Sequence, residues 1–81
     1  MGIEYKIKFS VPAGYDPSAL FKKLPNPVDQ PSMAEIYSYS LEQDGFYFVD
    51  YLVNRSAAAL ALRIFIDEAL KYAEHIVISE P

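Results

Sequence analysis

The side chains that could do chemistry in this chain are few. His75 is the only histidine and there is no cysteine, so the sequence offers neither a two-histidine metal site nor a thiolate ligand. The acidic residues lack the clustered spacing that a carboxylate-only metal site needs. No serine has the local signature of a nucleophile with its base, and Gly2, Gly14 and Gly45 do not form a phosphate-binding loop. The sequence therefore predicts a protein without catalytic residues and without a cofactor.

One group of residues keeps a small-molecule site open as an alternative. Tyr37 and Tyr39 could line an aromatic pocket around Asp50. An aspartate near Lys6 and Lys8, however, more often forms a salt bridge than acts as a general base.

Charge and composition favour protein partners over nucleic acid. The net charge is −4, with seven basic and eleven acidic side chains, which disfavours a phosphate backbone and mildly favours a basic protein. The chain has seven tyrosines and five phenylalanines. Because tyrosine is apolar in its body and polar at its tip, so high a share is typical of interaction surfaces.

No targeting or membrane segment is expected. The strand-like alternation that follows Met1-Gly2 is not a signal sequence. The most apolar stretch, residues 57–66, is interrupted by Arg63 and is shorter than the roughly 20 residues that a membrane span requires. We therefore expect a soluble, cytoplasmic protein with no membrane partner.

The elements that must position these side chains are organised around a hairpin over residues 35–53. Asp44-Gly45 separates two aromatic, β-branched runs, a pattern typical of a two-residue turn with positive φ. Leu41 would then face Phe48, and every facing pair would share one side of the sheet. One side would carry Tyr37, Tyr39, Leu41, Phe46, Phe48 and Leu52 around Asp50. The other would carry Ile36, Ser38, Ser40, Tyr47, Val49, Tyr51 and Val53.

Periodicity and capping signals predict the other elements. Asp16 and Asn54 are expected N-cap residues. Leu60 and Ile64 project among polar positions of the long helix, so they either pack under a loop or contact another chain. We expect a strand over residues 3–11, a helix over 17–24, an irregular proline-rich connection over 25–32, a helix over 55–73 and a strand over 75–79.

This order predicts one domain over residues 1–81 with a ferredoxin-like βαββαβ sandwich, which is an α+β fold. Its antiparallel four-stranded sheet would have the order 4-1-3-2, with both helices on one face. Lys6 and Lys8 would point away from the helices and meet Asp50, while Ser38 and Ser40 would leave room for the helices. The predicted open face consists of Tyr37, Tyr39, Leu41, Phe46, Phe48, Asp50 and Leu52.

Residues 44–51, Asp-Gly-Phe-Tyr-Phe-Val-Asp-Tyr, resemble the octapeptide that RNA-recognition motifs carry on their third strand. The resemblance covers eight residues, and the predicted topology and the chain length are also similar. It implies that Phe46 and Phe48 stack on bases from the open face. Because Asp44 replaces a basic residue of that motif and the chain is acidic, nucleic acid is the less favoured partner.

The predicted open face has a clear functional implication. It would carry an apolar patch on the order of several hundred Å², more than a monomer usually exposes. A two-fold dimer that packs sheet on sheet would bury it. The sequence thus favours a small non-enzymatic module that interacts with another protein or self-associates as a homodimer. Alternatives are an acidic binder of a basic protein, such as an immunity protein, a ferredoxin-like dimer that binds or converts a small molecule, a single-stranded RNA binder, and a monomer whose residues 25–32 cover the face.

Overall fold

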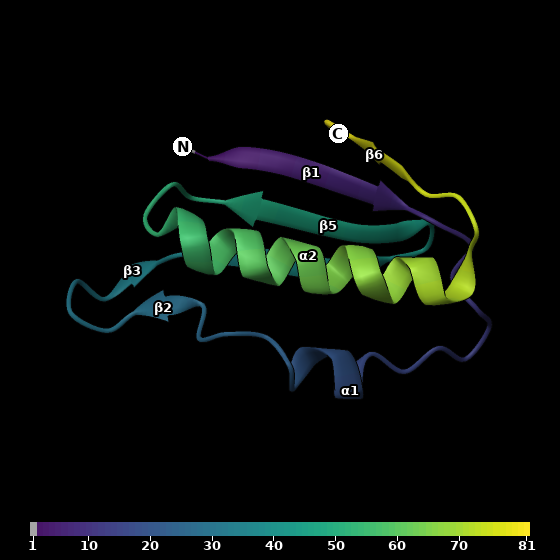
Figure 1. The fold of residues 1–81 in the computed structure, drawn as a ribbon, viewed down its shortest axis with the longest axis horizontal. Helices are drawn as coiled ribbons and strands as arrows, with labels where there is room; N and C mark the ends of the chain where they lie inside the picture. Colours follow the sequence, from purple (N-terminus) through teal and green to yellow (C-terminus); the bar gives the residue numbers. More distant parts are fainter. Residues whose placement is uncertain (1) are drawn as a thin grey trace.

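The computed structural model describes residues 2–81, which form one sheet layer with a long helix packed across it (Figure 1). The sheet has the strand order β4-β5-β1-β6 with antiparallel pairing, and β2 and β3 pair separately. The predicted α+β class and the antiparallel four-stranded sheet are confirmed. The elements are β1 (Ile3–Lys8), α1 (Ser18–Phe21), β2 (Val28–Asp29), β3 (Ala34–Glu35), β4 (Tyr37–Glu42), β5 (Gly45–Asp50), α2 (Arg55–Tyr72) and β6 (Val77–Ser79).

The hairpin of β4 and β5 forms with a register different from the predicted one. Leu41 lies opposite Phe46 and Glu42 lies opposite Gly45, so the two loop residues are Gln43 and Asp44, neither of which has positive φ. The predicted register is therefore wrong by two residues. Because side chains alternate with a period of two, a shift of two leaves the same side chains sharing a face.

Gly45 is required at its position for a reason other than the turn. Its φ is +146°, and a Cβ atom there would lie 1.9 Å from the carbonyl oxygen of Ile7. Gly45 pairs with Lys8 of β1, so its missing side chain allows the hairpin to approach the neighbouring strand.

The long helix forms almost as its sequence predicts. The Asn54 side chain accepts a hydrogen bond from the Ala57 backbone N–H at 3.1 Å, which satisfies one of the free donors of the first turn. A stripe of small residues around one large aromatic ring faces the sheet. The buried members of this stripe are Ala58, Ala61, Phe65 and Ala69.

The connection between β1 and β4 differs more from its prediction. The first helix is a single turn, and the Asp16 carboxylate accepts a hydrogen bond from the Ser18 backbone N–H at 2.9 Å just before it. The stretch 25–32, predicted to be irregular, contains β2. Val28 pairs with Glu35, and the Ile36 N–H donates to the Pro27 carbonyl at 2.7 Å. Prolines flank this short ladder without interrupting its bonds.

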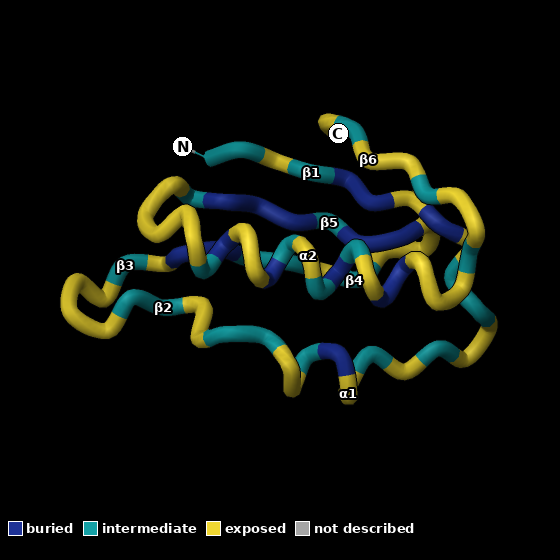
Figure 2. Tube along the Cα trace, in the orientation of Figure 1, coloured by how far each residue is buried: buried dark blue, intermediate teal, exposed yellow. Residues whose placement is uncertain are grey.

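The core lies between the sheet and α2 (Figure 2). The Phe65 ring packs against Phe46 and Phe48, with centroid distances of 5.0 and 5.8 Å. Ile7 of β1 lies opposite Phe46 and points to the same side. The prediction that this aromatic side of the hairpin is the open face is therefore wrong, because α2 covers it.

Candidate functional site

The seven residues predicted to form an exposed contact face lie mostly in the core. Tyr37, Phe46 and Phe48 are buried, and Asp50 is 5% exposed. Tyr39 and Leu41 are half-buried against the same cluster, and only Leu52 is exposed. The structure brings the first six together beneath α2, where Phe46 and Phe48 are not accessible to nucleic acid bases.

Asp50 has a structural role that differs from the predicted one. Its carboxylate accepts hydrogen bonds from the Leu52 backbone N–H at 2.8 Å and from Arg55 Nε at 3.0 Å. It does not meet Lys6 or Lys8, because its side chain lies on the opposite face of the sheet. Leu52 has a φ of +64°, so the Asp50 hydrogen bond stabilises a backbone conformation that is unfavourable for leucine.

The open face of the sheet is largely polar, and several of its polar side chains are paired with one another. The Tyr47 hydroxyl donates to Glu4 at 2.5 Å, and the Ser38 and Tyr51 hydroxyls are 3.0 Å apart. Register places these side chains on the open face: Glu4, Lys6, Lys8, Ser38, Ser40, Glu42, Tyr47, Val49, Val77 and Ser79.

Lys6 is the central charge of that open face and is 6% exposed. Its ammonium group forms ion pairs with Glu42 and Asp44. Burial lowers the pKa of Lys6, but the hydrogen bonds to Asp44 and Glu42 outweigh this effect and hold the pKa above its ordinary value. A compensated ion cluster of this kind stabilises the hairpin turn and offers no free charge to a ligand.

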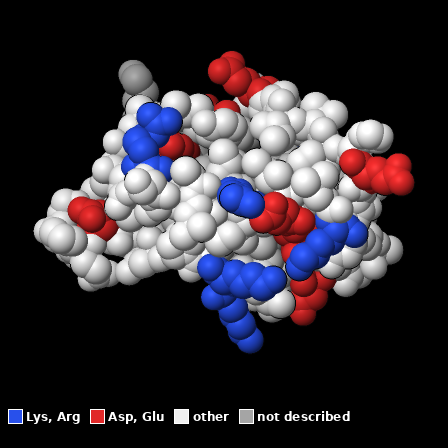
Figure 3. All heavy atoms as spheres, in the orientation of Figure 1, with Lys and Arg blue, Asp and Glu red and all other residues white. Residues whose placement is uncertain are grey.

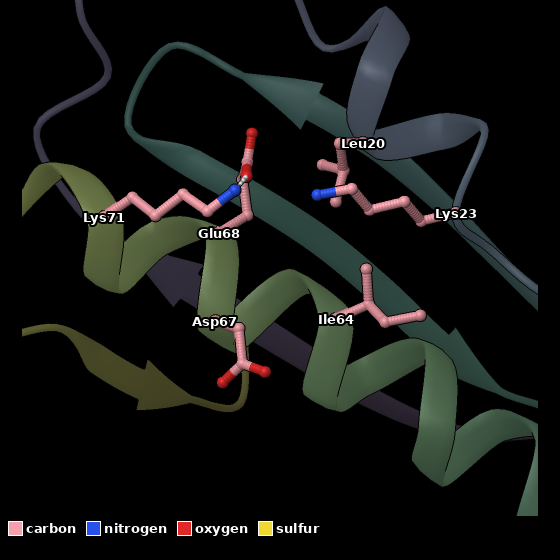
Figure 4. Close-up of a pocket in the computed structure, with 6 residues that line it drawn as sticks. All are labelled: Leu20, Lys23, Ile64, Asp67, Glu68 and Lys71. Carbon is pink, nitrogen blue, oxygen red and sulfur yellow. Dashed lines mark ion pairs between the residues drawn. The ribbon is translucent and has the colours of Figure 1, made fainter.

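A small cleft of about 250 Å³ lies between α1 and α2 (Figure 4). Glu68 is buried there, with Lys71 Nζ at 3.1 Å and the Tyr15 hydroxyl at 2.5 Å. Burial raises the pKa of Glu68, but the hydrogen bonds from Tyr15 and Lys71 outweigh it, so the pKa lies below its ordinary value. Charged side chains of both signs gather around this region (Figure 3). The residues that line the cleft are Leu20, Lys23, Ile64, Asp67, Glu68 and Lys71.

The two apolar residues that interrupt the polar side of α2 differ, since Leu60 is uncovered while Ile64 packs against the core. Leu60 is 54% exposed, and Ile64 lies half-buried at the wall of the cleft.

His75 is exposed after the end of α2. Within residues 2–81, no three side chains of histidine, cysteine, aspartate or glutamate are grouped as metal ligands. None of the helices in that range combines the length and apolar character that crossing a bilayer requires.

The free edge of β4 is the candidate site that sequence reasoning missed. Tyr51 N–H donates to the Ile36 carbonyl at 3.1 Å, and this bond sets the alternation of the ladder. The backbone groups of the even-numbered residues from Ser38 to Glu42 therefore point toward β5, while those of Tyr39 and Leu41 point away from the sheet. In the described part of the chain, Tyr39 and Leu41 have no other backbone partner.

Only part of this edge is open. At its beginning, β2 pairs with β3 immediately before β4, and the Tyr37 hydroxyl donates to the Pro25 carbonyl. The open part is the stretch from Tyr39 to Glu42, which we call the β4 edge. The predicted strand order already placed this strand outermost, and that was the signal that could have identified it.

Comparison with known proteins adds no assignment, since no family model, no curated protein and no solved structure matches this chain.

Proposed function

We propose that this protein is a small interaction module that binds an extended strand of a protein partner at the β4 edge. The unpaired backbone groups of Tyr39 and Leu41 are the observation that carries the proposal. A row of outward N–H and C=O groups is a template for strand addition, in which main-chain hydrogen bonds supply the affinity.

The β4 edge has few of the features that protect natural sheet edges. Its sequence, Tyr39-Ser40-Leu41-Glu42, contains no proline and no lysine, and its pairing with β5 is regular without a bulge. Proteins commonly use proline, lysine or a bulge to prevent edge pairing. The β4 edge is therefore competent to accept a strand.

We further propose that the fold is a variant of the ferredoxin-like class. Read from β6, the order of the four main strands, numbered along the chain, is 4-1-3-2. Leu20 of α1 joins the same core as α2, which supports placing both helices on one side of the sheet. The additional β2–β3 ladder is the departure from a plain βαββαβ arrangement.

The test uses a displayed library of random ten-residue peptides, selected against the immobilised protein. Selected peptides are then titrated against the wild type and against Leu41→Pro. Proline at this position removes the outward N–H together with the half-buried leucine side chain, while the β4–β5 ladder keeps all its hydrogen bonds. We expect the affinity of the selected peptides to fall at least tenfold, by roughly 1.4 kcal/mol or more.

Ile78→Pro is the matched control on the opposite edge. Because Lys6 and Lys8 direct their backbone groups to Ser79 and Val77, the Ile78 N–H points outward from β6. This variant should bind the selected peptides as the wild type does. Peptides that bind Leu41→Pro and the wild type equally, while both variants keep the native circular dichroism spectrum, would overturn the proposal.

A further inference from the structure

We infer that the strand bound at the β4 edge comes from a second copy of this chain, paired antiparallel about a two-fold axis at Ser40. This inference rests on the function proposed above and names its partner. It joins two four-stranded sheets into one continuous sheet of eight strands.

Strand geometry restricts where the two-fold axis can pass. The outward backbone groups belong to odd-numbered residues, so Tyr39 and Leu41 must bond to odd-numbered residues of the second copy. An axis at Tyr39 would require pairing at Tyr37, where the Pro25 segment and the β2–β3 ladder lie. An axis at Leu41 would pair Tyr39 with Gln43, which lies beyond the end of β4.

An axis at Ser40 uses only the open part of the strand. Tyr39 of each copy then pairs with Leu41 of the other, which forms four main-chain hydrogen bonds between the two chains. No residue outside Ser38–Glu42 has to pair. This is the one register that engages both outward donors of each chain without displacing β2.

The side chains that face each other in this register are compatible. On the open face, Ser40 meets its own counterpart, and the Ser38 hydroxyl lies opposite the Glu42 carboxylate, which can accept a hydrogen bond from it. On the helix face, Tyr39 lies opposite Leu41, and aromatic–aliphatic cross-strand pairs are favourable. Glu42, the only charged residue involved, faces a serine and keeps its ion pair with Lys6.

The net charge of the chain predicts how the dimer responds to salt. Each copy carries −4, so long-range repulsion opposes dimerisation, while the contact itself contains no ion pair between the copies. Added salt screens this repulsion. We expect the dimer dissociation constant to decrease when sodium chloride is raised from about 20 mM to about 500 mM, opposite to the response of a contact held by ion pairs.

The decisive test is cysteine cross-linking, because the chain contains no cysteine. In Ser40→Cys the two Cα atoms would be about 4.5 Å apart, within disulfide range. In Ser38→Cys, on the same strand and face, they would be roughly 14 Å apart. In a glutathione redox buffer, Ser40→Cys should form a covalent dimer, while Ser38→Cys and the exposed helix variant Ser56→Cys should not. Cross-linking of Ser40→Cys no greater than that of Ser56→Cys would overturn the inference.

Charge variants separate this inference from the proposed function. Ser40→Lys and Ser40→Glu each place like charges opposite one another, so each alone should raise the dimer dissociation constant at least tenfold, and an equimolar mixture should restore the dimer. Neither substitution removes the outward N–H of Leu41.

If the wild type is monomeric at every concentration in analytical ultracentrifugation while selected peptides still depend on Leu41, the second copy is excluded and strand binding stands. If peptide binding is also insensitive to Leu41→Pro, both proposals fail.

Discussion

The two faces of the sheet differ in their aromatic content, and only one of them is covered by a helix. The face under α2 carries Phe46 and Phe48, whereas the open face carries Tyr47. The hydroxyl of Tyr47 is bonded to Glu4, so the aromatic ring spreads over the sheet while its polar tip remains in water. The comparison shows that the number of aromatic rings distinguishes the covered face from the open one, since the covered face also carries Tyr5, Tyr37 and Tyr39.

The largest expected difference between the faces comes from placing a charge on each. Phe48→Glu would bury an unpaired carboxylate beneath Phe65, which the core cannot solvate, so the variant should not fold. Tyr47→Glu, the neighbouring residue on the open face, should cost about 1 kcal/mol. Urea denaturation followed by circular dichroism measures both. A folded Phe48→Glu would mean that α2 does not cover this face.

Cavity formation should show the same contrast on α2. Phe65→Ala removes the ring that contacts both Phe46 and Phe48 and should lower the free energy of unfolding by about 3 to 5 kcal/mol. Leu60→Ala, on the exposed side of the same helix, should change it by about 0.5 kcal/mol or less. Equal losses in the two variants would contradict the assignment of Leu60 to the surface.

Alkaline pH should weaken the covered face through the ionisation of Tyr37. Burial, with a smaller contribution from Tyr39, raises the pKa of Tyr37 from 10.0 to about 12. Since the pKa of the folded state is the higher one, the neutral phenol contributes its full stabilisation below pH 10. That contribution is lost as the pH rises to about 12. Tyr37→Phe should reduce this loss in urea titrations between these pH values, at a cost of about 1 kcal/mol at neutral pH for the lost hydrogen bond to Pro25.

A small effect is also expected at Lys6, the central charge of the open face. Lys6→Met removes the ion pairs with Glu42 and Asp44 but keeps the aliphatic stem that covers the sheet. Stability should change by less than about 1 kcal/mol. Its dependence on sodium chloride should become weaker, because the remaining pairs are few. A loss as large as that of Phe65→Ala would show that the open face contributes to stability as strongly as the core.

Local signals predicted β1, the β4–β5 hairpin, α2 and β6 but not the β2–β3 ladder, and the unknown register between distant strands led to the wrong open face. Asn54 as N-cap and the small-residue stripe of α2 follow from short-range patterns, and both are observed. No turn connects β1 to β5, so the pairing of Ile7 with Phe46 could not be derived from any local feature. A slip of one residue in this pairing would exchange the side chains on the two faces of the sheet. The predicted open face therefore depended on the register between β1 and β5.

The reasoning about side-chain size also misled the assignment of faces. The small side chains of Ser38 and Ser40 favour helices on their side of the sheet, but Ala58 and Ala61 on α2 provide the room for close packing on the other side. Large rings on a sheet pack against small residues on a helix as closely as small residues on a sheet pack against large residues on a helix. The candidate site, in turn, depends on backbone groups that every residue possesses, so no side-chain motif could identify it.

The central position of β1 has a consequence for how the chain acquires its structure during synthesis. Its Lys6 pairs with Ser79, almost the whole length of the chain away, and its other neighbour is β5. While the ribosome is still producing the later strands, β1 has no neighbour on either side and its apolar residues stay exposed. We expect the β4–β5 hairpin and α2 to form first and the sheet to close only after β6 has been synthesised, so the apolar residues of β1 stay exposed until then.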